Sequence, residues 1–173
     1  MAALVGATVT GLDYLEGESI SVVADGVTIA CPNNPAYAAI VVTSGVATLP
    51  SAGYTTVSVG LPITTDIQTL DLDNSSSSRK DAGSNVTRIG LWLEDSKTPF
   101  AGATVPTGDA VTNLQQMPQV DRNGTVTASL LSGYREVNID GAFTNHGRIF
   151  LRQVDPQPLT VLSIIPQGTF GRS

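Results

Sequence analysis

Two side chains that can act as a nucleophile or a general base occur once each in this chain. The only cysteine is Cys31, at a predicted strand end, and the only histidine is His146, in a predicted turn before a strand. Because Cys–His pairs form by proximity in space, a nucleophilic pair of these two residues stays open. Neither has a sequence neighbour that would activate it, so a packed thiol and a turn or interface histidine are the favoured interpretations.

Pairs of carboxylates are the second candidate for chemistry, because glycoside hydrolysis uses two of them. The candidate pairs are Glu16/Glu18, Asp71/Asp73 and Glu94-Asp95. A hydrolytic pair also needs a sugar-binding cleft, which aromatic side chains normally line, and the chain has only 1 Trp, 4 Tyr and 4 Phe. Solvated surface acids are the favoured interpretation.

The residues that could bind a metal ion or a phosphate do not occur at the spacing that such sites require. The segment Asp71-Leu72-Asp73-Asn74 begins like a calcium-binding loop but has neither Gly at its sixth position nor Glu at its twelfth. A single cysteine excludes an internal disulfide and a zinc site of several thiolates. No glycine-rich phosphate-binding loop follows a predicted strand. We expect no catalytic residues, no cofactor and no metal, and therefore no enzyme.

Charge and hydropathy narrow the function classes further. The 173 residues include 9 Lys and Arg against 15 Asp and Glu, and the net charge of −6 has the wrong sign for binding a phosphate backbone. No run approaches the roughly 18 apolar residues of a membrane span, and the first residues lack the basic start of a secretory signal. We expect a soluble chain made in the cytoplasm, without specific nucleic-acid binding and without a membrane span.

The elements that would position any site are strands. Only 14% of the residues are charged, and Ser, Thr, Gly and Asn take their place, which is typical of turn-rich β-structure. Period-2 alternation runs through residues 19–30 around Asp25-Gly26, the signature of a tight hairpin. The same pattern recurs at 39–50 and 54–60. Residues 1–72 are therefore predicted to form a small β-barrel or sandwich.

A second β-rich antiparallel part is predicted at residues 85–173, so the whole chain is predicted to be all-β with little helix. It follows a polar segment, residues 73–84, predicted to be a flexible linker or loop. Within the second part, residues 95–122 are predicted to be a long irregular loop and a candidate docking element. Only 109–117 has the pattern of a turn or two of helix.

Two predicted strands of this second part carry candidate interface residues. In the strand 86–93, the odd positions are expected to face the core and the even positions, which include Trp92, to face outward. Near the C-terminus, Arg148, Phe150 and Arg152 share one strand face, which gives a positive, partly apolar stripe on an acidic protein. A solvated strand face and a contact with an acidic neighbouring subunit both stay open.

Four segments carry a resemblance to a known family through their order and approximate spacing. They are residues 11–18 (GLDYLEGE), Asp25-Gly26, residues 59–62 (VGLP) and residues 147–162 (GRIFLRQVDPQPLTVL). The set resembles the C-terminal region of the tail nozzle proteins of short-tailed bacteriophages, also called tail tubular protein B, stabilisation or tail-hub proteins. Those proteins are several times longer and carry a large β-propeller portion before this region.

The resemblance implies a structural virion component located in the tail. It implies a ring of identical subunits, commonly six-fold, that extends the DNA-ejection channel and docks on adaptor, fibre or spike proteins. A competing interpretation is a carbohydrate- or receptor-binding β-sandwich of a tail fibre, which would need an exposed aromatic platform of Tyr54, Trp92 and Tyr134. A hydrolase of the tail tip that attacks cell-wall polymer is the third class.

Overall fold

The chain is all-β, as the alternation predicted. The computed structural model describes residues 3–71, 84–121, 123–139 and 147–170. In these ranges the only helical element is a single 3-10 turn, η1 (Asp13–Leu15). The prediction of a short helix at 109–117 is therefore wrong. Every paired strand is antiparallel, and no sheet of the described residues closes into a barrel.

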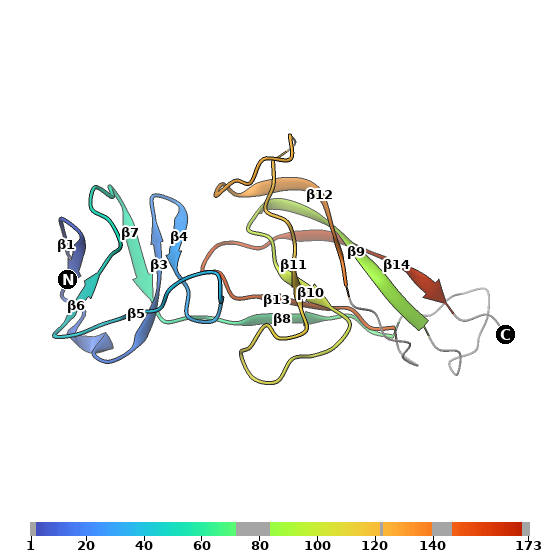
Figure 1. Ribbon diagram of the computed structural model, residues 1–173, viewed down its shortest axis with the longest axis horizontal. Helices are drawn as coiled ribbons and strands as arrows, with labels where there is room; N and C mark the ends of the chain where they lie inside the picture. The colour runs from blue at the N-terminus through green and yellow to red at the C-terminus, as the bar shows by residue number, and fades with distance from the viewer. Residues whose placement is uncertain (1–2, 72–83, 122, 140–146, 171–173) are drawn as a thin grey trace. The chain divides into compact units, whose positions relative to one another are not determined.

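The chain divides into two compact units (Figure 1). Unit 1 comprises residues 1–64 and 154–157, and unit 2 comprises residues 65–153 and 158–173. This division lies earlier than residue 72, because the strand that begins at Thr65 pairs within unit 2. Of the predicted linker 73–84, all but Ser84 lies outside the described residues.

Unit 1 is built from short strands in two sheets. β1, β2 and β6 form one sheet, and β3 pairs with β4, β5 and β7 in the other. Its strands are β1 (Ala3–Val5), β2 (Thr8–Thr10), β3 (Ser19–Ala24), β4 (Val27–Ala30), β5 (Ile40–Val41), β6 (Val46–Thr48) and β7 (Val57–Gly60). The predicted hairpin turn joins β3 to β4, with positive φ of 48° at Asp25 and 80° at Gly26. The prediction of a closed barrel in this part is wrong, because the sheet of β1, β2 and β6 is separate from the sheet of β3, β4, β5 and β7.

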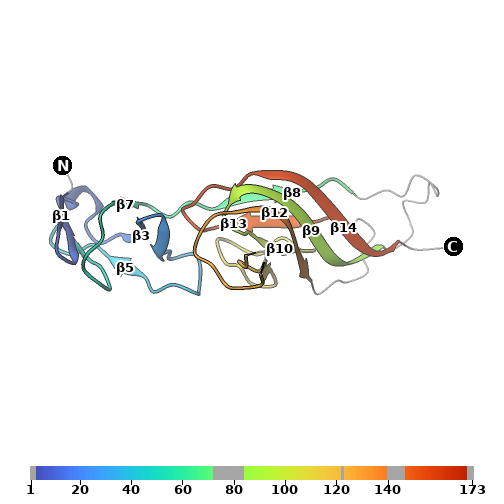
Figure 2. The same ribbon diagram turned by 90° about the horizontal axis from the view of Figure 1, so that it is seen from above.

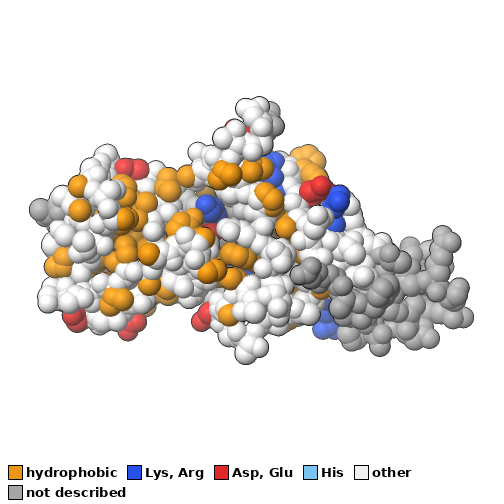
Figure 3. Space-filling view, viewed as in Figure 1, with side chains coloured by type: hydrophobic (Ala, Val, Ile, Leu, Met, Phe, Trp, Pro, Cys, Tyr) orange, Lys and Arg blue, Asp and Glu red, His pale blue; other side chains and the backbone are white. Residues whose placement is uncertain are grey.

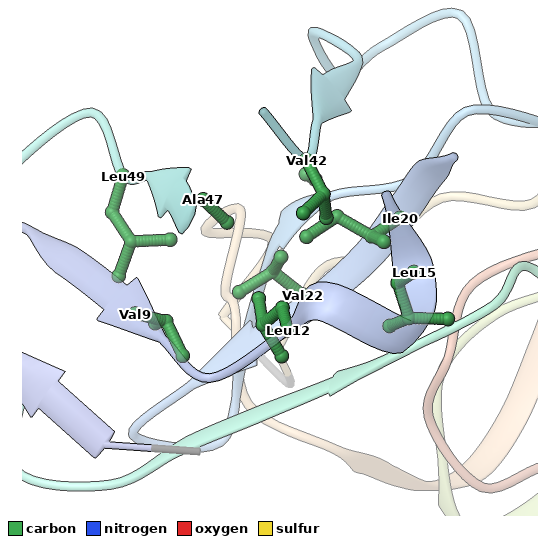
Figure 4. Packing of buried hydrophobic residues seen from close by; sticks show 9 residues of the cluster. Val9, Leu12, Leu15, Ile20, Val22, Val42, Ala47 and Leu49 are labelled. Atoms are coloured by element: carbon green, nitrogen blue, oxygen red, sulfur yellow. The ribbon is translucent and has the colours of Figure 1, made fainter. Parts of the chain in front are cut away.

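The core of unit 1 draws apolar side chains from strands, from the η1 turn and from the segment around β6 (Figure 4). Leu12 and Leu15 lie three residues apart at η1, and a 3-10 turn places such residues on one side. Figure 4 shows Leu12, Val22 and Val42 directed into a common interior. The buried members are Val9, Leu12, Leu15, Ile20, Val22, Ala30, Val42, Ala47 and Leu49.

Unit 2 has longer strands, again in two sheets. One sheet has the order β12-β9-β14 and the other the order β11-β10-β13-β8 (Figures 1 and 2). The strands are β8 (Thr65–Gln68), β9 (Ser84–Ser96), β10 (Phe100–Gly102), β11 (Gln115–Gln116), β12 (Leu131–Asn138), β13 (Phe150–Gln153) and β14 (Val161–Phe170). The range 95–122 is therefore not irregular throughout, since it contains the end of β9 and all of β10 and β11.

The central strand β9 follows the predicted alternation except at one place. Ile89, Leu91 and Leu93 are buried in the unit 2 core, as expected for odd positions. Val86 is also buried and Thr87 is exposed, which reverses the expectation for these two residues. The cause is a bulge: Arg88 pairs with Gln167 and Val86 with the next residue of β14, so Thr87 is an extra residue in the ladder.

Candidate functional site

The candidate nucleophile Cys31 is a buried thiol within unit 1. Its Sγ donates a hydrogen bond to the carbonyl oxygen of Val154 at 3.0 Å. Burial raises the pKa of this thiol above its ordinary value, and the nearby charge of Asp155 raises it further. A protonated, buried thiol suits packing rather than nucleophilic attack. The predicted partner, His146, lies outside the described residues.

Two acids from the segments that carry the resemblance bind backbone N–H groups, and one of them, Glu16, belongs to the candidate hydrolytic pair Glu16/Glu18. Glu16 accepts hydrogen bonds from the backbone N–H groups of Gly45 and Ser44, both at 2.8 Å, and these bonds lower its pKa. Asp25 accepts from the N–H of Thr56 at 2.8 Å and from that of Thr55 at 3.1 Å, which likewise lowers its pKa. Both carboxylates therefore hold a loop of unit 1 in place.

Besides the contacts of Glu16 and Asp25, side-chain hydrogen bonds hold residues 154–157 in unit 1. We call these bonds the discontinuous joint, because this segment comes from the distant C-terminal part of the sequence. The Nδ2 of the buried Asn34 donates to Asp155 Oδ1 at 3.1 Å. Gln157 donates from Nε2 to the carbonyl oxygen of Gly26 at 2.5 Å and accepts from Thr28 Oγ1 at 3.2 Å. Sequence reasoning missed this joint, because no local pattern connects residues more than a hundred positions apart.

Of the predicted stripe of Arg148, Phe150 and Arg152, the last two are alternate residues of β13, Arg148 lies before this strand, and the stripe is not an exposed surface. Phe150 and Arg152 are each only 3% exposed. The Arg152 guanidinium lies 5.5 Å from the centroid of the Phe150 ring, a cation–π distance. Of the three, only Arg148 is exposed, in an ion pair with Asp71.

Arg152 is instead the anchor of the β11-β10-β13-β8 sheet. Its Nε and Nη2 donate to the two carboxylate oxygens of Asp66, both at 2.7 Å, and its Nη1 donates to the carbonyl oxygens of Gly108 and Ala110, both at 2.6 Å. The hydrogen bonds that Arg152 donates to the Asp66 carboxylate raise the pKa of Arg152. Two candidate interface residues, Arg152 and Phe150, are thus used inside unit 2. Sequence reasoning missed Asp66, because its cross-strand pairing with Arg152 follows from the topology of the sheet.

The remaining candidate, Trp92, lies on the outer face of the β12-β9-β14 sheet and is 47% exposed. Its ring centroid is 6.0 Å from that of Tyr134, with the planes tilted by 53°. Tyr134 and Trp92 are direct cross-strand partners. The expected third aromatic, Tyr54, belongs to unit 1, where it packs against the apolar core. The structure therefore brings two of the three expected aromatic residues together.

A glycine and a charged network complete this face. A Cβ at Gly90 would lie 2.6 Å from Cε2 and 2.8 Å from Cζ of Tyr134, so the Tyr134 ring occupies the space that the missing side chain leaves. The Tyr134 hydroxyl donates to Glu136 Oε2 at 3.1 Å. Arg88 forms an ion pair with Glu136 at 3.4 Å and donates to Asn138 Oδ1 at 3.0 Å. Figure 3 shows basic, acidic and hydrophobic side chains next to one another over β12 and β9.

Across the described residues, no three His, Cys, Asp or Glu residues form a group that could hold a metal ion. No helix within them is long and apolar enough to cross a bilayer.

Comparison with known proteins leaves the site to be interpreted from its own geometry. No protein-family model matches the chain, and no curated protein matches it either.

Proposed function

We propose that this chain is a non-enzymatic structural subunit of the tail of a short-tailed bacteriophage, of the nozzle or tail-hub type. It assembles with copies of itself into a ring, commonly six-fold in the family it resembles, that extends the DNA-ejection channel. Adaptor, fibre or spike proteins dock on this ring. The proposal places the protein in the virion tail and assigns it no cofactor.

The observation that carries the proposal is the role of the segments that resemble the nozzle family. Glu16 and Asp25 hold loops of unit 1, and Gly60 pairs with Ser21 of β3. The segment 147–162 supplies Arg152 to the unit 2 sheet and residues 154–157 to unit 1. Each segment therefore supports the framework of the fold, and a resemblance concentrated in framework residues favours a structural protein over an enzyme.

Exposed apolar side chains beside a sheet edge support self-assembly. β8 pairs with β13 on one side and, among the described strands, with none on the other. Ile67 of β8 is 38% exposed and Leu70, just beyond it, is 88% exposed. An open strand edge with large exposed apolar residues favours pairing with another chain. We assign this edge of unit 2 to the contact between ring subunits.

The acidic charge fits the channel role in the proposal. A net charge of −6 would let the phosphate backbone of DNA pass a channel wall without binding to it. Retention of DNA by the assembled ring at low salt would contradict this role. The stretch between β10 and β11, residues 103–114, is the longest part of the predicted docking loop outside the strands, and we keep it as the candidate for adaptor or fibre contact.

The mass and symmetry of the purified chain test the proposal. We expect light scattering to report a concentration-dependent oligomer and negative-stain imaging to show rings. The double variant Ile67→Ser, Leu70→Ser should abolish the rings, and Val126→Ser, at an exposed residue away from β8, should retain them. A monomer at all concentrations would contradict the ring. A trimer would favour the competing function, a carbohydrate- or receptor-binding domain of a tail fibre.

A further inference from the structure

The outer face of the β12-β9-β14 sheet arranges aromatic, amide and charged side chains in rows. The inner face buries Leu91 and Leu93, so the alternate residues of β9 point away from the core. Strand register then aligns outward residues from all three strands. The rows are Tyr134–Trp92–Ser163, Glu136–Gly90–Ile165 and Asn138–Arg88–Gln167. We call the residues of these rows the aromatic face.

The apolar part of the aromatic face is a small plate. Trp92 presents about half of its surface to solvent, and the Tyr134 ring continues the plate across β9 over Gly90. Ile165, 37% exposed, lies in the adjacent row. A plate of this size, surrounded by polar groups, is too small for the hydrophobic centre of a stable protein–protein interface.

The polar part of the face is held in place before any ligand arrives. Glu136 receives a hydrogen bond from Tyr134 and an ion pair from Arg88, and Arg88 also binds Asn138. These contacts fix the orientation of planar side chains that still have donors and acceptors to offer, since a guanidinium has five N–H donors and a carboxylate has several lone pairs. Such a preorganised rim lowers the entropic cost of binding.

A sugar ring matches this combination of groups. A pyranose has an apolar C–H face that stacks on an aromatic plane and hydroxyl groups at its edge that bind amides, carboxylates and guanidinium groups. The face also mixes both signs of charge, which disfavours a polyanion such as nucleic acid. At about 3.3 Å per residue, Trp92 and Arg88 are about 13 Å apart along β9, so the face accommodates more than one sugar ring.

We infer that the aromatic face is a binding site for a pyranose oligosaccharide, with one sugar ring stacked on Trp92 and the chain running along β9 toward Glu136, Arg88 and Asn138. This inference goes beyond the tail role and depends only on the geometry of unit 2. A structural ring subunit with such a face would also contact glycans.

The test uses the fluorescence of Trp92, which is the only tryptophan of the chain and lies in the proposed site. Cellohexaose, maltohexaose and chitohexaose are each titrated to about 10 mM, which detects a dissociation constant of about 1 mM. At least one should shift the Trp92 emission in a saturable way. Saturation-transfer NMR should show signal on the C–H protons of the same sugar.

Variants separate binding at this face from binding elsewhere. Gly90→Ala displaces the Tyr134 ring but retains the Trp92 reporter. Arg88→Ala removes the guanidinium that contacts Glu136 and Asn138 in the polar rim. Each variant should lower the affinity for the sugar about tenfold. Tyr14→Ala removes an exposed aromatic residue of unit 1 and should leave the titration unchanged. Circular dichroism confirms that each variant is folded.

Three results would overturn the inference. They are the absence of any response to all three hexasaccharides, a response that Gly90→Ala and Arg88→Ala leave unaltered, and an emission shift that depends on protein concentration alone. The last result would assign the face to a second copy of the chain. The first two results do not depend on whether the chain forms rings, so the inference and the tail role can fail separately.

Discussion

Unit 1 and unit 2 are both antiparallel β-structures, but different polar contacts hold them together. In unit 1 the strands are two to six residues long, and side chains such as Glu16 and Asp25 bind the backbone of loops. In unit 2 the central strand β9 has 13 residues with a partner on each side, and the buried Arg152 binds Asp66. Short strands leave more backbone N–H groups without ladder partners, so side chains must satisfy them.

The difference predicts different sensitivities for the two units. The carboxylate joints of unit 1 are exposed, so protonation and single polar substitutions should act on them. Unit 2 depends on the close approach of strand backbones and on an ion pair whose arginine is buried, so steric changes and uncompensated charge should act there. Trp92 reports on the unfolding of unit 2 alone, and hydrogen exchange measured by mass spectrometry reports on unit 1.

The largest expected effect is steric. A Cβ at Gly168 of β14 would overlap the carbonyl oxygen of Asn85 and lie 2.8 Å from the Cα of Val86. These atoms belong to the backbone of β9 and have no rotamer with which to move away, so Gly168→Ala should cost unit 2 about 3 kcal/mol in denaturant unfolding followed by Trp92. Gly60→Ala in β7 of unit 1 has nothing within 4 Å and should change stability by about 0.5 kcal/mol or less. An equal loss of stability in the two variants would mean that the strands of both units tolerate an added Cβ equally.

Uncompensated charge should have the second largest effect. Asp66→Ala leaves the Arg152 guanidinium without a carboxylate, and the Arg152 side chain is only 4% exposed. Because Asp66 itself is partly exposed, the expected loss is about 2 kcal/mol, below the range for a fully buried pair. Asp71→Ala breaks the exposed pair with Arg148 and should cost less than about 1 kcal/mol. A loss of the same size in both variants would remove the distinction between anchor and surface pair.

Unit 1 can be opened at its discontinuous joint. Asn34→Ala removes the buried hydrogen bond to Asp155 and the partly buried one accepted from the N–H of Ala36, at an expected cost of about 1 to 2 kcal/mol. Hydrogen exchange should accelerate in residues 154–157 while unit 2 is unaffected. Asn33→Ala is the matched control, because it removes a partly buried side-chain hydrogen bond to Thr64, and it should have the smaller effect. Unchanged exchange in 154–157 would show that apolar contacts alone hold this segment.

The local features of both units could be predicted from the sequence because they depend on neighbouring residues. Alternation identified the buried odd positions of β9 and the outward Trp92, and Asp25-Gly26 identified the hairpin. The bulge at Thr87 could not be predicted, because one extra residue in a ladder changes the register without changing the composition. The Val86 assignment failed for this reason alone.

The contacts of the candidate sites depend on residues far apart in the chain. Asn34 and Asp155 are separated by 121 positions, and Arg152 and Asp66 by 86, so their pairing follows from topology rather than from any spacing. Alternation correctly placed Phe150 and Arg152 on the same side of a strand, but it cannot tell whether other residues cover that side, and both residues are buried. The Trp92–Tyr134 contact likewise needed the register of β12 on β9.

The smallest expected effect is the pH dependence of unit 1. Backbone N–H groups lower the pKa of Asp25 and of Glu16 in the folded state, so the unfolded state binds protons more readily and folding is favoured above the ordinary pKa values of these groups. This stabilisation is lost as the pH falls through the folded values. The hydrogen-exchange protection factors of residues 43–46 and 54–57, which correct for the slower intrinsic exchange in acid, should therefore fall as the pH is lowered. Asp25→Asn should flatten the pH dependence of exchange at 54–57, and Glu16→Gln should flatten it at 43–46. Glu18→Gln changes an exposed acid whose side chain has no hydrogen bond to those loops in the described structure, so it should leave both pH dependences intact. An acid response that all three variants share would place the titrating groups elsewhere in unit 1.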